Sequence, residues 1–275
     1  MSLSFHNTFP LERDNLAKLL AAASDNPAVS NFEIAEKTGI GIGKNPRKGK
    51  VQPTVDYAAN AGLLNALNSR EGRKLQITPI GRAVQDNDPW FKKPTTQWVL
   101  HYQLAKLGSE AEAWTFFAHQ FLPSHPVFTR ADLEAGLSGE FGHKIKLKIL
   151  NPGVLLNCYL EGGGLERIRL VREQSKRQFV RTQSYIPNAY TVAYILAEIW
   201  EARHPDRSMI NPVTLLEPGH LATTMNLSEA EIAPWLDELN SLGLVKQMQE
   251  APPYQIARQW SEKLHLMQKS YDEEG

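Results

Sequence analysis

The sequence predicts a mainly α-helical protein with small β-hairpins, an α+β fold in which a helical segment joins two winged helix-turn-helix-like domains. Apolar residues recur at helical spacing along most of the chain, and two sets of helices are each followed by a short hairpin pattern. We expect a basic winged domain in residues 1–94, a helical middle segment with a basic hairpin in 95–185, an acidic winged-helix-like domain in 186–260 and a C-terminal tail in 261–275.

The composition is ordinary for a globular protein, with 42% hydrophobic and 22% charged residues in a chain of 275. No apolar run approaches the length of a membrane span, and the N-terminus lacks the basic-then-apolar pattern of a signal peptide. The single cysteine, Cys158, excludes an internal disulfide and is typical of a reducing compartment. We therefore expect a cytoplasmic protein without a membrane partner.

The formal net charge is zero, but the charges are unevenly distributed. Residues 37–50 carry a net charge of +5, residues 142–185 carry +6, and residues 186–275 carry −7. This division favours a body that faces a polyanion and a C-terminal region that faces something else. Chance clustering of solvated charges is the alternative.

Three short helices and a hairpin are predicted in the first domain. The first helix follows Pro10, the second is capped by Asn31 and ends at Gly39, and the third runs from about residue 53 to 60. Two strands then surround residues 68–73, the second covering 74–78, and a closing helix follows Pro79. This order of elements is typical of a winged helix-turn-helix domain.

The stretch 38–64 is the best candidate for contact with nucleic acid. Its glycine-rich first half has no acidic residue, and its second half predicts a helix, so that a flexible cationic turn feeds a helix N-terminus. A merely solvated charge run is the alternative. The candidate DNA contacts are Lys44, Asn45, Arg47, Lys48, Lys50, Gln52 and Thr54 around the turn, and Arg70, Arg73 and Lys74 on the hairpin.

The same glycines do not form a nucleotide-binding loop. A Walker A loop requires glycine where the chain has Thr38, and Ser or Thr where it has Asn45. The dinucleotide fingerprint fails as well, because its third glycine would fall at Lys44.

The middle segment combines buried aromatic helices with basic residues. Trp98 and its apolar neighbours predict a buried helix over 95–107, an aromatic helix ends before Pro123, and Thr129 caps a helix that continues to residue 137. After a tight loop at 162–164, alternating residues predict a second basic hairpin, which offers either a phosphate-contacting surface or a solvated sheet face. Its cations are Arg167, Arg169, Arg172, Lys176, Arg177 and Arg181; Lys144, Lys146 and Lys148 alternate in a similar way upstream.

The last third predicts an apolar helix over 190–202, a turn over 218–226, a helix over 229–242 capped by Ser228, and a hairpin through 251–253. The helix over 229–242 contains four acidic residues and no Lys or Arg, so it cannot favour DNA phosphates. We interpret it as a scaffold or a protein-binding surface, and we expect residues 272–274 to be disordered.

Familiar catalytic and metal motifs are missing from the sequence. The eight histidines show no His-Glu-x-x-His spacing, there is no Gly-x-Ser-x-Gly elbow, and a single cysteine disfavours structural zinc. No metal ligands are assigned. Taken alone, the residues support a DNA-binding protein and no particular reaction.

Several segments in order resemble one bacterial family of unknown function. They are Phe-His-Asn-Thr-Phe-Pro-Leu-Glu-Arg at 5–13, Gly-Ile-Gly-Lys-Asn at 41–45, Asp-Pro-Trp-Phe at 88–91, Thr-Gln-Trp-Val-Leu-His at 96–101, the aromatic run at 114–117 and Glu-Pro-Gly at 217–219. The family is associated with DNA phosphorothioation and includes SspB, the DNA-nicking component of the single-strand system. The likeness covers most of the chain.

This resemblance implies a nickase-like component of a phosphorothioation-based antiphage defence system. Such a protein would nick or open DNA so that a partner can replace a non-bridging phosphate oxygen by sulfur. The implied partners are DNA, a cysteine desulfurase, an ATP-dependent sulfur-transfer protein and an ATPase. The chain departs from the family at Asn7, where the family has Glu, and at Pro46, where a hydrophobic residue is usual.

Four residues at motif positions have chemistry suited to nicking. His6 or His101 can act as acid or base, Arg13 can hold a phosphate, and Asp88 can hold Mg²⁺ or Mn²⁺. Two of them also have a structural interpretation, because His101 lies beside apolar residues and Asp88 precedes a proline in a turn. The alternative function is a non-catalytic winged-helix adaptor or regulator that recruits the sulfur-transfer machinery.

Overall fold

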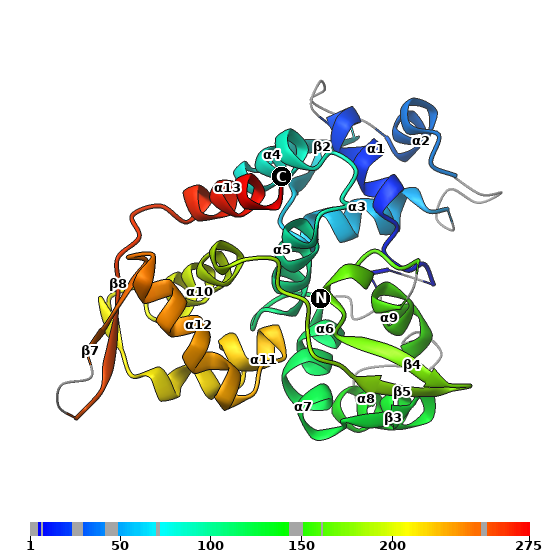
Figure 1. The fold of residues 1–275 in the computed structure, drawn as a ribbon. Helices are drawn as coiled ribbons and strands as arrows, with labels where there is room; N and C mark the ends of the chain where they lie inside the picture. The colour runs from blue at the N-terminus through cyan, green and yellow to red at the C-terminus, as the bar shows by residue number, and fades with distance from the viewer. Residues whose placement is uncertain are drawn as a thin grey trace.

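A computed structural model describes residues 5–6, 8–23, 30–41, 49–69, 72–142, 151–160, 162–248 and 252–275. It is a mixed fold, mainly helical, with small antiparallel sheets, which confirms the coarse fold class. Three units surround a central helix, α5 (Pro94–Ala105), as Figure 1 shows. The predicted boundaries at 94 and 185 fall beside the start of α5 and shortly before α10 (Ala189–Arg203).

The N-terminal unit contains three helices, a hairpin and a closing helix, in the predicted order. Ser30, rather than Asn31, caps the second helix, because its hydroxyl accepts from the Glu33 N–H in a capping box. Phe32, an aromatic residue in the first turn of this helix, is 63% exposed. The elements are α1 (Arg13–Ala23), α2 (Asn31–Thr38), α3 (Val51–Asn60), β1 (Leu64–Ser69), β2 (Gly72–Ile77) and α4 (Pro79–Asn87).

The middle unit packs aromatic helices against a three-stranded antiparallel sheet of order β3-β5-β4. Thr129 caps α8 as predicted, with a reciprocal hydrogen bond from Asp132. The predicted hairpin over 165–181 is shorter than expected, since residues 166–168 form a 3-10 turn. The elements are α6 (Glu112–Phe116), the π-helical η2 (Phe117–Phe121), α7 (Leu122–Ser124), β3 (Val127–Thr129), α8 (Arg130–Phe141), α9 (Pro152–Tyr159), η3 (Glu166–Ile168), β4 (Val171–Ser175) and β5 (Gln178–Arg181).

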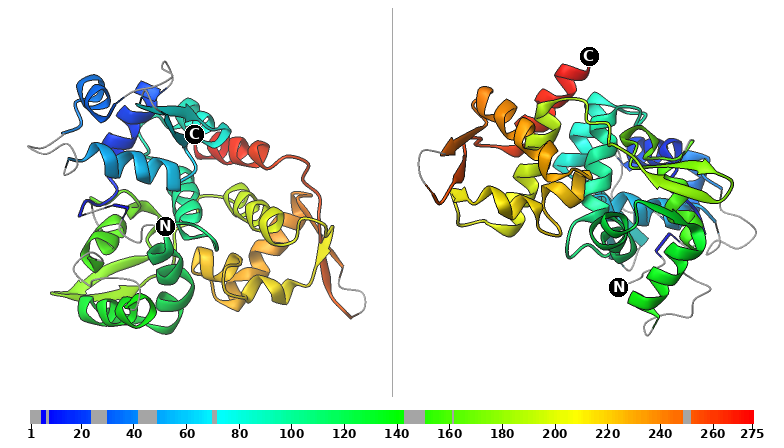
Figure 2. Two further views of the ribbon diagram at one scale, coloured as in Figure 1. Left: turned by 180° about the vertical axis from the view of Figure 1, so that it is seen from behind. Right: turned by 60° about the horizontal axis from the view of Figure 1, so that its bottom comes forward.

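The C-terminal unit also ends in a three-stranded antiparallel sheet, of order β6-β8-β7, at the outer edge of the molecule in both views of Figure 2. Ser228 caps its acidic helix as predicted, whereas the expected turn over 218–226 contains a short helix. Besides α10, the elements are β6 (Met209–Ile210), η4 (Pro212–Leu216), α11 (Leu221–Met225), α12 (Glu229–Ser241), β7 (Val245–Met248) and β8 (Gln255–Arg258).

The predicted disorder of the tail is wrong. Residues 263–274 form α13 (Lys263–Glu274), which returns across the molecule to pack against α10, α4 and α5 (Figure 1). Leu266, Met267 and Tyr271 are buried at this contact, and the buried Ser270 hydroxyl bonds with Thr95 of α5. Burial of this apolar stripe stabilises the helix despite its acidic end.

Helix α5 is buried on every side, because every residue from Thr95 to Ala105 is buried. A buried polar side chain is costly unless it is hydrogen-bonded, and polar residues of α5 find partners in α13 and in the middle and C-terminal units. Thr96 shares a hydrogen bond with Tyr271 of α13, and Gln97, Trp98 and His101 reach the middle and C-terminal units. Among the described helices, none is long and apolar enough to cross a membrane.

Candidate nucleic-acid interface

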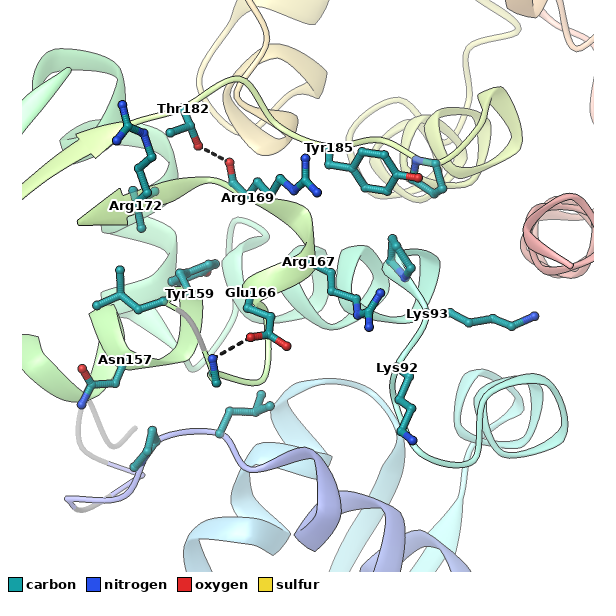
Figure 3. Close-up of a pocket in the computed structure, with 18 of the residues that line it drawn as sticks. Lys92, Lys93, Asn157, Tyr159, Glu166, Arg167, Arg169, Arg172, Thr182 and Tyr185 are labelled. Atoms are coloured by element: carbon teal, nitrogen blue, oxygen red, sulfur yellow. Dashed lines mark hydrogen bonds between the residues drawn. The ribbon is translucent and has the colours of Figure 1, made fainter. Parts of the chain in front are cut away.

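A groove of about 1520 Å³ lies between the entry to α1, the start of α5, the turn η3 and the end of α13 (Figure 3). Five basic side chains line it: Lys92, Lys93, Arg167, Arg169 and Arg172. Five acidic side chains line it as well: Glu12, Glu166, Glu173, Glu273 and Glu274. Formal charge alone therefore does not decide which ligand this groove prefers.

Most of the groove carboxylates already have internal partners. Glu12 forms an ion pair with Lys50 at 2.7 Å, and Glu166 forms one with Arg13 at 2.9 Å. Glu166 also accepts from the Gly162 N–H at 2.6 Å, as the dashed line in Figure 3 marks. The remaining partners are the Arg177 N–H for Glu173 and the Thr95 N–H for Glu274, whose pKa is raised by burial.

The groove cations, in contrast, are largely unpaired, and all of them except the half-buried Lys93 are exposed. Within the described ranges, Lys92, Arg167 and Arg172 form no side-chain hydrogen bond or ion pair. Arg169 lies against the ring of Tyr185, and the Lys93 ammonium lies over the ring of Tyr271. Because Glu12 and Glu166 are paired with Lys50 and Arg13, which do not line the groove, five groove cations face three remaining carboxylates, and the groove offers net positive charge to a ligand.

Two side chains of α5 position the backbone of groove residues from behind. The Gln97 side-chain oxygen accepts from the Arg167 N–H at 2.9 Å, and the Trp98 indole N–H donates to the Tyr185 carbonyl at 2.8 Å. Both contacts hold the backbone of residues that face the groove. Residues 96–101 thus support the backbone of the groove from α5, but they do not line the groove themselves.

A tight loop shapes the neighbouring wall, as the three glycines at 162–164 predict. Gly162 has a φ of 78°, which favours glycine. A Cβ on Gly163 would lie 2.2 Å from the Asn157 carbonyl oxygen, and one on Gly164 would lie 2.0 Å from the Leu11 side chain. Larger residues at 163 and 164 would displace the groove wall.

His101 sits behind the groove with both ring nitrogens engaged. Its Nε2 donates to the Thr224 carbonyl at 2.9 Å, so that Nδ1 accepts from the Tyr159 hydroxyl at 2.8 Å. Burial lowers the pKa of His101 to about 3, and the ring is neutral at physiological pH. This environment favours a structural role.

The other three catalytic candidates lie apart from His101. Arg13 reaches the groove through Glu166, whereas both oxygens of Asp88 accept backbone N–H groups, from Lys92 at 2.9 Å and Lys93 at 2.7 Å. His6 is buried, with its ring against Phe5, Tyr57 and Trp114. Asp88 thus shapes the turn that carries two groove lysines.

The predicted contacts of the N-terminal unit are mostly engaged or lie outside the described residues. Lys44, Asn45, Arg47, Lys48 and Arg70 lie outside them, as do Lys144, Lys146 and Lys148. The Thr54 hydroxyl donates to the Lys50 carbonyl, and Gln52 bonds with Asp56 and Asn31. Arg73 is half-buried, and Lys74 is exposed on β2.

Sequence reasoning missed Lys92, Lys93, Thr182 and Tyr185 as groove residues. The two lysines follow the Asp-Pro-Trp-Phe motif directly, which is the one sequence signal that pointed to them. Their position depends on Asp88 and on Phe91, which has a φ of 57°.

A Mg²⁺ or Mn²⁺ site requires oxygen ligands grouped together, or one or two carboxylates completed by substrate phosphates. Within the described ranges, no group of three or more His, Cys, Asp or Glu side chains could hold a metal ion. Both oxygens of Asp88 and both of Glu166 already accept hydrogen bonds. The described side chains therefore do not form a metal site on their own.

Comparison with known proteins gives one family match and two structural matches. The sequence model of a family described as "Protein of unknown function (DUF4007)" matches residues 3–152, while no curated protein matches the chain. A magnesium ion-bound SspB crystal structure superposes with a TM-score of 0.80 at 18% identity, covering 98% of this chain and 86% of that one. A second SspB crystal structure gives 0.78 at 19% identity, with the same coverage. At these identities the likeness shows a shared fold.

Proposed function

The chain belongs to the DUF4007 family, and we propose that it binds the sugar-phosphate backbone of DNA in its basic groove, as a nickase-like component of a DNA phosphorothioation system. The observation that carries the binding proposal is that, among the described residues, the groove carboxylates mostly have hydrogen-bond or ion-pair partners within the protein, whereas three of the groove cations do not. These three cations, Lys92, Arg167 and Arg172, are exposed. Phosphate oxygens are the ligands that such cations prefer.

The phosphorothioation role is supported by the family and by the fold shared with SspB. In such a system the chain would expose or cut one strand for sulfur transfer in the cytoplasm as part of antiphage defence. Its proposed partners are a cysteine desulfurase and an ATP-dependent sulfur-transfer protein.

For nicking, the groove arginines supply the cations that stabilise the negative charge of a pentavalent phosphorus. His6, Arg13, Asp88 and His101 remain the proposed catalytic set. Of these four, Arg13, Asp88 and His101 each contact a residue that lines the groove: Glu166, Lys92 and Tyr159, respectively.

The test is a plasmid assay with the purified full chain. Supercoiled DNA incubated with Mg²⁺ or Mn²⁺ should be converted to open circles, and the double variant R167A/R172A should show slower conversion together with weaker DNA binding. The variant K246A/R258A, which changes two cations on β7 and β8, is the matched control. Intact salt-sensitive binding without open circles under either metal would contradict nicking.

A non-catalytic adaptor is the second candidate function. It is favoured by the contacts of Asp88 and His101, whose oxygens and nitrogens all have structural partners. In this case the chain binds DNA through the groove, and α12 offers carboxylates to a sulfur-transfer partner.

A further inference from the structure

One aromatic ring is exposed inside the basic groove. Tyr185 is 43% exposed, lines the groove, and has its ring 5.2 Å from the Arg169 guanidinium carbon, in a cation–π contact (Figure 3). Within the described residues, its hydroxyl has no hydrogen-bond partner. The pair thus presents an aromatic ring beside a guanidinium group, and both have flat faces.

Both residues are held by their backbones. The Tyr185 N–H donates to the Ile168 carbonyl at 2.9 Å, and the Tyr185 carbonyl accepts from Trp98 of α5. The Thr182 hydroxyl donates to the Arg169 carbonyl, which fixes the two chain segments to each other. The ring is therefore held in the groove at little further cost in entropy.

Arg169 also has an unusual conformation. Its φ of 53° and ψ of 47° lie in the left-handed region, which costs an arginine on the order of 1 kcal/mol. Such conformations cluster at functional sites, where the surrounding structure maintains them. Here the conformation accompanies the placement of the guanidinium against the Tyr185 ring.

We propose that Tyr185 and Arg169 form a stacking platform for an unpaired base of a DNA strand whose backbone lies in the groove. This inference rests on the proposed DNA binding and names the form of DNA that the groove prefers. Aromatic rings and guanidinium planes stack on base faces without regard to sequence. In an intact duplex those faces are covered by neighbouring base pairs, so the platform acts only at a bulge, gap or frayed end.

The test measures binding of the full chain to two DNAs that differ by one nucleotide. One is an intact 20-base-pair duplex, and the other carries a single bulged 2-aminopurine, whose fluorescence falls when the base stacks. The wild type should bind the bulged duplex about tenfold more tightly and quench its fluorescence. The variant Y185L should lose both effects, so that it binds the bulged and the intact duplex with affinities that agree within about twofold.

Two further variants separate stacking from bulk and from folding. Y185W keeps a stacking face and should keep the preference, and Y254L removes an equally exposed tyrosine that does not line the groove. Circular dichroism confirms that each variant is folded. An unchanged preference in Y185L, or no quenching with the wild type, would overturn the platform while leaving backbone binding intact. If the wild type bound neither DNA, both the platform and the proposed function would fail.

Discussion

The groove and the acidic face of α12 (Glu229, Glu231, Asp237 and Glu238) differ in which of their charges are not neutralised by ion pairs within the protein. The groove has equal numbers of basic and acidic side chains, but Glu12 and Glu166 are neutralised by Lys50 and Arg13, which do not line it. On α12, Glu231 accepts from Ser228 and Gln183, and Asp237 accepts from Gln247, so the donors are uncharged. The sign of the charge that a surface presents to a ligand therefore depends on ion pairing within the protein more than on the number of charged residues.

Because of this difference, we propose different partners for the two faces. A phosphate backbone is attracted to the groove and repelled by α12, where hydrogen bonds from Ser228 lower the pKa of Glu231 and keep it ionised. The acidic face suits a basic protein surface, and its role as a scaffold or a protein-binding surface stays a prediction. Four experiments test this comparison, from the largest expected effect to the smallest.

The largest effect concerns the junction between the two faces, where His101 and His119 hold α11. His119 donates to the Ala105 carbonyl at 2.9 Å and accepts from Thr223 at 2.8 Å, and burial lowers its pKa to about 4. Because both folded-state pKa values lie below the ordinary value of 6.5, the unfolded chain takes up protons first as pH falls. The free energy of unfolding should be highest above pH 6.5. It should fall as the pH is lowered towards 4, by about 1.4 kcal/mol per pH unit for each histidine.

Urea unfolding at pH 7.5, 6 and 5 measures this loss. The variant H119Q keeps a donor and an acceptor but does not titrate, so it should remove about half of the slope. A free energy of unfolding that stayed constant over this range would contradict the buried neutral state of both histidines.

The next effect exchanges the charges of the two faces. Reversing a charge that lies about 4 Å from a phosphate in water changes the interaction by about 2 kcal/mol, or roughly 30-fold in affinity. R167E or R172E should weaken duplex binding at low salt by this amount, whereas E229K/E238K should not weaken it. Fluorescence anisotropy with a labelled duplex measures both, and equal losses for the two faces would refute the division between them.

A smaller effect tests the internal pairing itself. R13A releases Glu166 into the groove, where the new negative charge should weaken DNA binding by about 1 kcal/mol, or roughly fivefold. R13A/E166Q, which removes that charge as well, should restore binding. If the double variant binds DNA but does not nick it, Arg13 acts on the phosphate; if it does both, Arg13 only neutralises Glu166.

The helices were largely predictable, but the groove was predictable only in part. Apolar spacing and caps such as Thr129 and Ser228 predict elements locally, and the basic run from Arg167 to Arg172 was visible as a charge pattern. The contribution of Lys92 could not be predicted, because this residue lies in a turn about 75 residues away in sequence from Arg167.

Helix α13 shows a second reason for failure. Its acidic end resembled a disordered tail, yet the spacing of Leu266, Met267, Ser270 and Tyr271 marks one helical face. That face is buried only because α10, α4 and α5 meet it, and this tertiary contact has no local signal. The pairing of Glu166 with Arg13 likewise joins residues that are 153 positions apart.

The most direct test of the central claim is the salt dependence of duplex binding. If Arg167 and Arg172 each contact a phosphate, the slope of log Ka against log salt should become about two units less steep in R167A/R172A than in the wild type. The control K246A/R258A, whose two residues lie on β7 and β8 and do not line the groove, should keep the wild-type slope. An unchanged slope in R167A/R172A would contradict the groove as the DNA-binding surface.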